Sequence, residues 1–152
     1  MTKLIWVIKL IDFSILKDIR EDHDLTQEKM AEILGVKRST YSLWELGINI
    51  IPIDDLSNFA DYFDLNIDYI VGLSKNRSNN GNKSNFDINI LGQNLKKLRK
   101  KNKLTQEEFG KLINVSQAAI NKYESGKIQI SFSNLYILSK KFNISIRELL
   151  SK

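Results

Sequence analysis

The sequence predicts an all-α protein made of two tandem domains, and three observations support this prediction. Shifting the chain by 79 residues aligns positions 16–73 with 95–152 without a gap, giving 14 identities in 58 positions. Apolar residues in each copy recur at helical spacing. Ser or Thr followed three positions later by Glu marks several helix starts. Because solenoid units are only ~20 to 50 residues long, the repeat indicates a duplicated domain.

The first two helices of the second copy are predicted from an apolar pattern and a capping motif. Leu91, Leu95 and Leu98 recur at helical spacing, which predicts a helix over residues 90–102. Thr105 and Glu108 match the Thr-x-x-Glu capping box, which satisfies free amide groups at a helix start. We therefore expect a second helix to begin directly after Thr105, with an apolar face formed by Phe109, Leu112 and Ile113.

The third helix follows the second after a short turn. The residues Asn114-Val115-Ser116 interrupt the helical pattern, Ser116 can cap a helix from residue 117 to about 124, and Gly126 can end it. Two helices joined in this way form a helix-turn-helix arrangement, whose second helix is presented to the major groove of DNA. A fourth helix is expected at about 133–142, and a fifth at the capping box of Ser145 and Glu148.

A polar segment separates the two copies. Residues 74–85 read SKNRSNNGNKSN and contain no apolar side chain, which is typical of a flexible linker. The predicted organisation is a first domain over 1–73, a linker over 74–89 and a second domain over 90–152.

The two halves carry opposite net charges. Residues 1–75 hold 8 Lys/Arg and 13 Asp/Glu, a net charge of −5, whereas residues 76–152 hold 15 Lys/Arg and 5 Asp/Glu, a net charge of +10. Affinity for a polyanion comes mainly from neutralising phosphates and releasing counterions. We therefore expect the second half to carry most of the affinity for nucleic acid, with its cations forming one continuous surface that includes the third helix.

Composition argues against several other classes of protein. The absence of Cys excludes disulfides, thiolate nucleophiles and Cys-based zinc sites. The single histidine, His23, lies among Glu21, Asp22 and Asp24 and is interpreted as a solvated turn residue. No nucleophile with a neighbouring base, Gly-rich phosphate loop or set of metal ligands is recognisable. The expectation is a protein that is not an enzyme and that needs neither a cofactor nor a metal.

The apolar N-terminal residues 4–8 are not expected to form a membrane span or a signal peptide. Lys9 and Asp12 interrupt the stretch, and a span needs ~20 apolar residues. We expect no membrane contact and a cytoplasmic location. The β-branched and aromatic character of residues 4–8 suits a strand or arm that packs on the first domain or on a second subunit, and a wrongly assigned start codon is the alternative.

Two stretches of the chain resemble a known family. The string LTQEEFGKLINVSQAAINKYESGK (104–127) and its counterpart LTQEKMAEILGVKRSTYSLWELG (25–47) are similar to the Cro/C1-type (Xre-like) helix-turn-helix family of phage and bacterial repressors. Together the two resemblances cover about three quarters of the chain. They imply two lambda-repressor-like five-helix domains and a bacterial or phage origin. They also imply double-stranded DNA as the partner of a homodimer that binds a palindromic site.

The resemblance also implies roles for individual residues. The Gln that opens the second helix would contact a DNA phosphate, a role that falls to Gln27 and Gln106. Lys96 and Lys127 are assigned to phosphate as well. An Arg of the first helix would pair with the Glu that ends the third, which here predicts the structural pairs Arg20 with Glu45 and Arg99 with Glu124. The expected base-contacting residues are Ser116, Gln117, Ala118, Asn121 and Lys122, with Lys37, Arg38, Ser39, Ser42 and Leu43 as the corresponding first-domain positions.

Each assignment has a simpler structural alternative. Gln106 and the capping residues could merely stabilise a helix, and the basic run 96–103 could be a solvated face. Aromatic and aliphatic residues of the third helices are interpreted as core or edge residues rather than base-stacking platforms; these are Tyr41, Trp44, Ile120 and Tyr123.

The first copy departs from the pattern where it would meet DNA. Lys29 and Lys37 stand at capping positions, and Leu43 replaces Lys122. Four acidic residues, Asp18, Glu21, Asp22 and Asp24, stand where the second copy has Lys97, Lys100, Lys101 and Lys103. Like charges beside phosphate repel. However, Lys37 and Arg38 could still enter a groove.

The hypothesis from the sequence is a sequence-specific transcriptional regulator, a repressor, that reads DNA with the third helix of its second domain. The first domain is expected to bind DNA weakly or to contact protein, with dimerisation through residues 4–11. The alternative is a protein-interaction module, such as an antitoxin or an anti-repressor, whose acidic first domain binds a basic partner protein.

Overall fold

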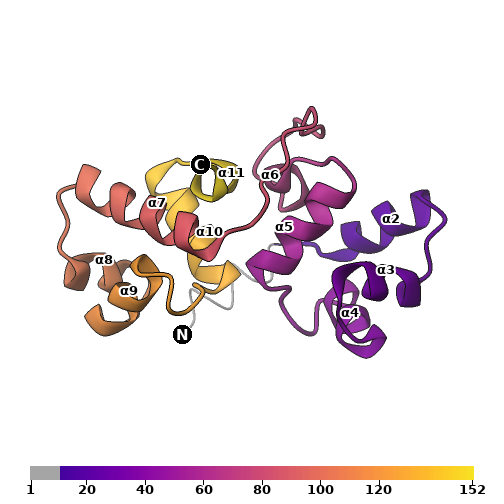
Figure 1. The fold of residues 1–152 in the computed structure, drawn as a ribbon, viewed down its shortest axis with the longest axis horizontal. Coiled ribbons are helices and arrows are strands. Elements are labelled where there is room, and N and C mark those ends of the chain that lie inside the picture. Colours follow the sequence, from indigo (N-terminus) through magenta and orange to yellow (C-terminus); the bar gives the residue numbers. More distant parts are fainter. Residues whose placement is uncertain (1–10) are drawn as a thin grey trace. The chain divides into compact units, whose positions relative to one another are not determined.

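The computed structural model describes residues 11–152, and that part of the chain contains ten α-helices and no β-strand (Figure 1). The chain divides into two compact units, with the boundary between Lys83 and Ser84. The expected arm at 4–8 lies outside the described residues, as does the expected dimer contact through 4–11 except for Ile11.

Within residues 11–152 each unit contains five helices, in the order that the repeat predicts. In the first unit these are α2 Ser14–Asp22, α3 Gln27–Leu34, α4 Arg38–Glu45, α5 Ile53–Tyr62 and α6 Ile67–Ile70. In the second unit they are α7 Ile88–Lys101, α8 Gln106–Leu112, α9 Gln117–Glu124, α10 Phe132–Phe142 and α11 Ile146–Leu150. The prediction of an all-α fold with two five-helix domains is confirmed.

The helices of the second unit begin at capping residues. The side chains of Thr105, Ser116 and Ser145 accept hydrogen bonds from backbone N–H groups one turn on, as predicted. Two caps were not predicted, and each moves a helix start by one or two residues. Asp87 accepts from the Asn89 amide, so α7 begins at Ile88, and Ser131 caps α10.

The core of each unit is formed by the apolar faces of its helices. In the second unit Leu91, Leu95 and Leu98 of α7 are buried, together with Phe109 and Ile113. Ile120 of α9 is also buried, as are Tyr41 and Trp44 of α4 in the first unit, so these three are core residues, as expected. Burial on one side of α4 and α9 leaves the opposite side of each helix at the surface.

Part of the segment that was expected to be a flexible linker is attached to the first unit. The Asn66 amide donates to the Arg77 carbonyl at 2.8 Å, and the Asn79 amide donates to the Asp64 carbonyl at 3.0 Å. Leu65 and Ser78 form an isolated antiparallel bridge. These bonds hold residues 77–82 against the loop between α5 and α6. They use backbone groups, which are present whatever the side chains are, so the polar composition of the segment did not reveal the attachment.

No helix in residues 11–152 has the length and apolar character needed to cross a membrane. Within the same residues, no group of three or more His, Cys, Asp or Glu side chains is arranged to hold a metal ion.

Candidate nucleic-acid interface

The turn between α8 and α9 is closed by backbone contacts. The Val115 amide donates to the Gly110 carbonyl at 3.0 Å, and Asn114 adopts a positive φ of 56°. A Cβ on Gly110 would lie 2.5 Å from the Val115 carbonyl oxygen, closer than two such atoms can approach. A glycine at position 110 therefore allows the turn to pack directly against α8, and this fixes the angle at which α9 leaves it.

The two units differ in how they hold the start of the third helix. Ser116 accepts a hydrogen bond from the Ala119 amide at 3.1 Å and so caps α9. Lys37 occupies the equivalent position before α4 and makes no side-chain cap. Thr105 and Glu108 form a complete capping box, whereas Thr26 caps the Lys29 amide without a reciprocal bond. The departures predicted for the first copy are therefore present.

A buried ion pair attaches the end of α9 to α7. Arg99 Nε donates to Glu124 Oε1 at 2.5 Å, Nη2 donates to Oε2 at 3.1 Å, and Nη1 donates to the Leu104 carbonyl at 2.9 Å. Burial of the Glu124 carboxyl opposes its ionisation, but hydrogen bonds from Arg99 and Gln106 outweigh this effect and lower its pKa. The carboxylate is thus charged at neutral pH and holds the end of α9 in place.

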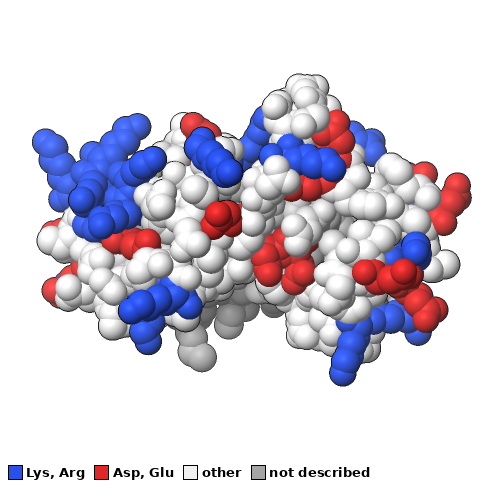
Figure 2. All heavy atoms as spheres, viewed as in Figure 1, with Lys and Arg blue, Asp and Glu red and all other residues white. Residues whose placement is uncertain are grey.

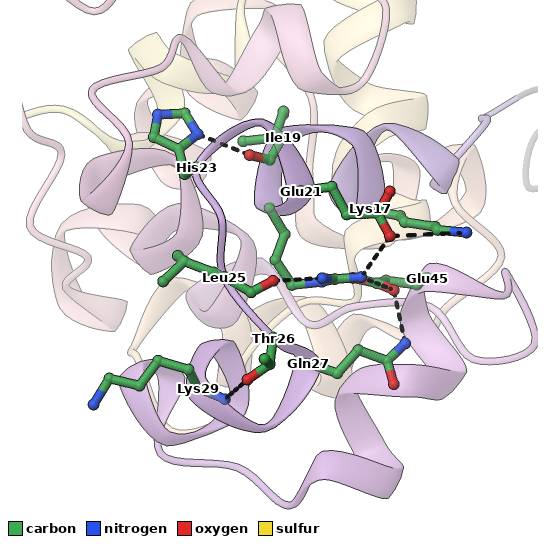
Figure 3. A network of polar contacts seen from close by, with 10 residues as sticks. Lys17, Ile19, Glu21, His23, Leu25, Thr26, Gln27, Lys29 and Glu45 are labelled. Carbon is green, nitrogen blue, oxygen red and sulfur yellow. Dashed lines mark hydrogen bonds and ion pairs between the residues drawn. The ribbon is translucent and has the colours of Figure 1, made fainter.

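The first unit contains the same arrangement, shown in Figure 3. Arg20 Nε donates to Glu45 Oε1 at 2.6 Å and Nη1 to the Leu25 carbonyl at 2.6 Å. Both pairs that the resemblance implied, Arg20 with Glu45 and Arg99 with Glu124, are present in the structure.

Gln106 and Gln27 belong to these clusters. Gln106 Nε2 donates to Glu124 Oε2 at 3.0 Å, and Gln27 Nε2 donates to Glu45 Oε2 at 2.8 Å (Figure 3). Each glutamine amide group has two hydrogens. One is used in the internal bond, and the second can serve a phosphate oxygen. The glutamine therefore has a structural role that is compatible with the phosphate contact predicted for it.

The structure brings six of the predicted DNA-contacting residues together around one shallow hollow of ≈ 430 Å³. Its lining comes from the start of α8, the outer side of α9 and the loop after α9. We call this surface the α9 face, and it consists of Gln106, Gln117, Ala118, Asn121, Lys122 and Lys127.

Two further predicted residues lie outside this hollow. Ser116 is exposed at the start of α9 next to Gln117, with its hydroxyl used as the cap. Lys96 lies on α7, close enough to Glu124 for its charge to help lower the pKa of that carboxyl.

The first unit has a corresponding hollow of ≈ 360 Å³, lined by Arg38, Ser39, Ser42 and Leu43. Lys37 is exposed before α4. The first-unit residues that correspond to the predicted base-contacting residues of the second unit are thus at the surface, on α4 or directly before it.

Two functional candidates in the first unit were missed by the sequence analysis. Leu46 and Ile48, which follow α4, are each 66% exposed. In the repeat they align with Ser125 and Lys127. The 79-residue alignment contains this signal, because it places two large apolar side chains opposite a serine and a lysine. The α4 surface is therefore more apolar than the α9 face.

The basic residues of the second unit form two groups on the one side of the molecule that Figure 2 shows. On the side of the molecule seen in Figure 2, a dense group of Lys and Arg covers the end of α7, and a smaller group lies near α9, with acidic and uncharged atoms between them. Lys97 and Lys101 line a different hollow from Lys122 and Lys127. On this side of the molecule the basic residues thus form two groups rather than the single surface that was expected, and Lys97 and Lys101 point away from the side of α7 that packs on α9.

A family model described as helix-turn-helix matches the chain twice, over residues 16–70 and 95–149. The chain belongs to this helix-turn-helix family. It is the Cro/C1-type family that the residues resemble, and it is a family of DNA-binding regulators rather than of enzymes. The two matched segments coincide with the two copies of the repeat.

Several curated proteins are similar to part of the chain. Antitoxin PezA of Streptococcus pneumoniae serotype 4 is 38% identical over 56 residues, which is 37% of this chain and 35% of the relative. The uncharacterized HTH-type transcriptional regulator YobD of Bacillus subtilis is 37% identical over 59 residues, covering 39% of this chain and 53% of the relative. The HTH-type transcriptional activator BcrR of Enterococcus faecalis is 42% identical over 61 residues, covering 40% of this chain and 30% of the relative.

The chain thus spans about a third to a half of the length of these relatives. No solved structure matches the chain significantly.

Proposed function

We propose that this protein is a sequence-specific DNA-binding transcriptional regulator that inserts α9 of its second unit into the major groove. The observation that carries the proposal is the α9 face, where a Gln, an Asn and two Lys side chains surround one hollow on the exposed side of a helix held rigidly at both ends. Family membership and the regulators among the relatives support it.

The chemistry of the α9 face fits base recognition. Gln117 and Asn121 can donate to and accept from an adenine edge, Lys122 can reach guanine acceptors, and Ala118 can contact a thymine methyl group. Ser116 lies at the end that would enter the groove first, where hydroxyl groups can bond to bases or phosphates. Gln106, Lys96 and Lys127 border the helix and are proposed as phosphate contacts that set its position.

We further propose that regulation is repression by occupancy of promoter DNA, carried out by a homodimer on a palindromic site in a bacterial or phage-infected cytoplasm. Family membership supports the homodimer, since paired helix-turn-helix domains match the two-fold symmetry of their operators. The proposed activity requires no cofactor and no catalytic group.

The first unit is proposed to bind DNA more weakly. Lys37, Arg38, Ser39 and Ser42 could reach a groove, but apolar Leu43, Leu46 and Ile48 replace the lysines and the serine of the second unit. Each missing cation removes one counterion-releasing contact with phosphate. The second unit is thus expected to provide most of the binding free energy.

Mapping bound sites across a genome, with variants of the full chain, tests this proposal. Gln117→Ala and Lys122→Ala should each change the preferred base at one position of the site, at a cost of ~1–3 kcal/mol. Gln106→Ala should weaken binding to all sites about equally. Lys111→Ala, an exposed lysine paired with Glu107 on α8, serves as the control. An unchanged site preference after both α9 substitutions would show that α9 does not read the sequence.

A second function has specific support. The similarity to an antitoxin, together with the exposed Leu46 and Ile48, favours a protein partner for the first unit. In that case the protein would act as an antitoxin or anti-repressor, and the acidic surface of the first unit would bind a basic protein. Co-purification from the native host distinguishes the two functions. A protein partner that co-purifies in stoichiometric amount, and that a Leu46→Ser/Ile48→Ser variant no longer binds, would support the second function. If no such partner co-purified, the second function would be excluded.

A further inference from the structure

Four lysines at the end of α7 are not used by the proposed DNA interface. This α7 lysine patch consists of Lys97, Lys100, Lys101 and Lys103, all of them exposed. Among the described residues no acidic side chain forms an ion pair with any of the four. Four cations within seven residues repel one another, so the patch costs folding stability unless a partner compensates for it.

Two lysines of the patch, Lys97 and Lys101, face away from the α9 face. On α7 the side that packs against α9 is marked by Gly92, where an added Cβ would lie 2.5 Å from the Tyr123 carbonyl oxygen, and by Arg99, which bonds to Glu124. Lys97 and Lys101 follow Gly92 by five and nine positions and therefore point to another side of the helix. They line a hollow of ≈ 350 Å³ with Phe142, Ile144 and others, and none of its lining residues belongs to the α9 face.

The hollow beside the patch can accept part of a partner. Its floor includes apolar side chains of Leu98, Phe142 and Ile144, and its rim includes Lys97 and Lys101. Glu148 is the one acidic residue in its lining, and its carboxylate is turned towards its own helix cap, where it accepts from the Ser145 amide at 3.3 Å. The hollow thus combines apolar contact with positive charge.

In the first unit, the equivalent place is covered by the protein itself. His23 packs on Phe63 with ring centroids 4.6 Å apart, and residues 77–82 are bonded to the loop from Asp64 to Asn66. No comparable segment of this chain is bonded to the loop Asn143–Ser145 of the second unit in the described residues.

The chain also carries a surface of the opposite charge at the equivalent positions of the first unit. In the 79-residue repeat, each lysine of the α7 lysine patch aligns with an acidic residue of the first unit. We call these four residues the α2 acidic patch: Asp18, Glu21, Asp22 and Asp24. Figure 2 shows acidic side chains over the end of α2 and basic ones over the end of α7. Asp24 and Lys103 share a positive φ, of 54° and 57° respectively, so the two patches end in the same backbone turn.

We propose that the α7 lysine patch binds the α2 acidic patch of a second copy of this chain. Asp18 and Asp22, which have no ion pair within the described structure, would meet Lys97 and Lys101. Glu21 is also near Lys17 and Arg20, at 3.9 and 3.4 Å, and contributes less. The contact joins two different surfaces, so each copy can hold two neighbours and the assembly extends head to tail. Such a contact would make occupancy of adjacent DNA sites cooperative.

Charge reversal in the full chain tests this proposal without DNA. Sedimentation velocity at low salt should show concentration-dependent association of the unchanged protein, which weakens as salt screens the patches. Lys97→Glu/Lys101→Glu should weaken association by about tenfold or more, and Asp18→Lys/Asp22→Lys should do the same, because each places like charges opposite each other. Lys75→Glu/Lys83→Glu, with the same change in net charge as the lysine reversal, should associate as the unchanged protein does.

The decisive sample is an equimolar mixture of the two reversed variants. In each variant alone, positions 97 and 101 carry charges of the same sign as positions 18 and 22, whereas the mixture brings opposite charges together at these positions, so the mixture should regain the association that each variant lost. Thermal unfolding of both variants checks that these surface changes leave the fold intact. Association beyond the proposed homodimer that survives either reversal, or a mixture that stays as weakly associated as its components, would overturn the proposal. Assembly that does not depend on concentration would also overturn it, because the contact would then lie within one chain.

Discussion

The two units of this protein share their internal supports and differ at their surfaces. Both hold the third helix with a buried Arg–Glu pair, Arg20 with Glu45 and Arg99 with Glu124, to which a glutamine adds a hydrogen bond. Outside this framework the charge of corresponding positions is often reversed. The comparison shows that the ion pair belongs to the fold, whereas the exposed positions determine what each unit binds.

The largest expected effect comes from breaking the shared ion pair. Glu45→Gln or Glu124→Gln leaves a buried guanidinium without its counter-charge, and each should lower the free energy of unfolding of its own unit by about 2–4 kcal/mol. Denaturant titration monitored in each unit measures this loss. Glu28→Gln, an exposed position on α3, should change stability by less than about 0.5 kcal/mol. If only one of the two buried substitutions lowered the free energy of unfolding, the Arg–Glu pair would not stabilise both units in the same way.

A smaller effect is expected where α7 and α9 touch. The Cβ of Gly92→Ala would lie 2.5 Å from the Tyr123 carbonyl and 2.8 Å from that of Glu124, so one helix must move. Overpacking of this kind costs about 1–3 kcal/mol and should also weaken DNA binding, because the recognition helix shifts. Gln93→Ala, one position further on the exposed side of α7, should leave both properties unchanged. Normal stability of the Gly92 variant would mean that the helices can separate without cost.

The side-chain cap before the third helix is present only in the second unit, and we expect it to stabilise that unit by about 1 kcal/mol. Exchanging the residues between copies measures this difference directly. Ser116→Lys removes the side-chain acceptor of the Ala119 amide and should destabilise the second unit by about that amount, while Lys37→Ser should stabilise the first. Thermal unfolding of the two variants should give shifts of opposite sign. Shifts of the same sign would argue that the cap does not distinguish the units.

The smallest effect concerns a charge on α5 of the first unit. Burial and the neighbouring charge of Asp54 raise the pKa of Asp55 from 3.8 to about 6. A raised carboxyl pKa favours folding at low pH and loses that contribution as pH rises through about 6, so ionised Asp55 opposes folding at neutral pH. Asp55→Asn, which introduces the residue that the second unit has as Asn134, should stabilise the first unit at pH 7–8 by less than about 1 kcal/mol, because the site is partly exposed. The gain should vanish near pH 4 in thermal scans, and a gain of equal size at both pH values would contradict the assignment.

Local chemistry explains which parts of this structure could be predicted from the sequence. The caps at Thr105, Ser116 and Ser145 depend on neighbours within one turn, so short motifs identify them. The Arg–Glu pairs came from the family resemblance. The attachment of residues 77–82 was missed because it uses backbone hydrogen bonds, which leave no pattern of side chains.

In the candidate site, too, some features could be predicted from the sequence and others could not. The residues of the α9 face were predicted from the family resemblance, and helical spacing explains why Gln117, Asn121 and Lys122 share one side of α9. The separation of Lys97 and Lys101 from that face was missed because net charge was counted over the whole domain, without regard to the direction of each side chain. Direction depends on how α7 packs, and Gly92 is the residue that reveals it.

The central claim is that the second unit provides most of the affinity for DNA, and a salt titration of the two units tests it most directly. Residues 11–83 and 84–152 would be prepared separately and titrated against one duplex at several salt concentrations. The account predicts tighter binding by the second unit and a steeper slope of log K against log salt, by ~0.9 for each additional phosphate contact. Equal affinities and equal slopes for the two units would contradict it.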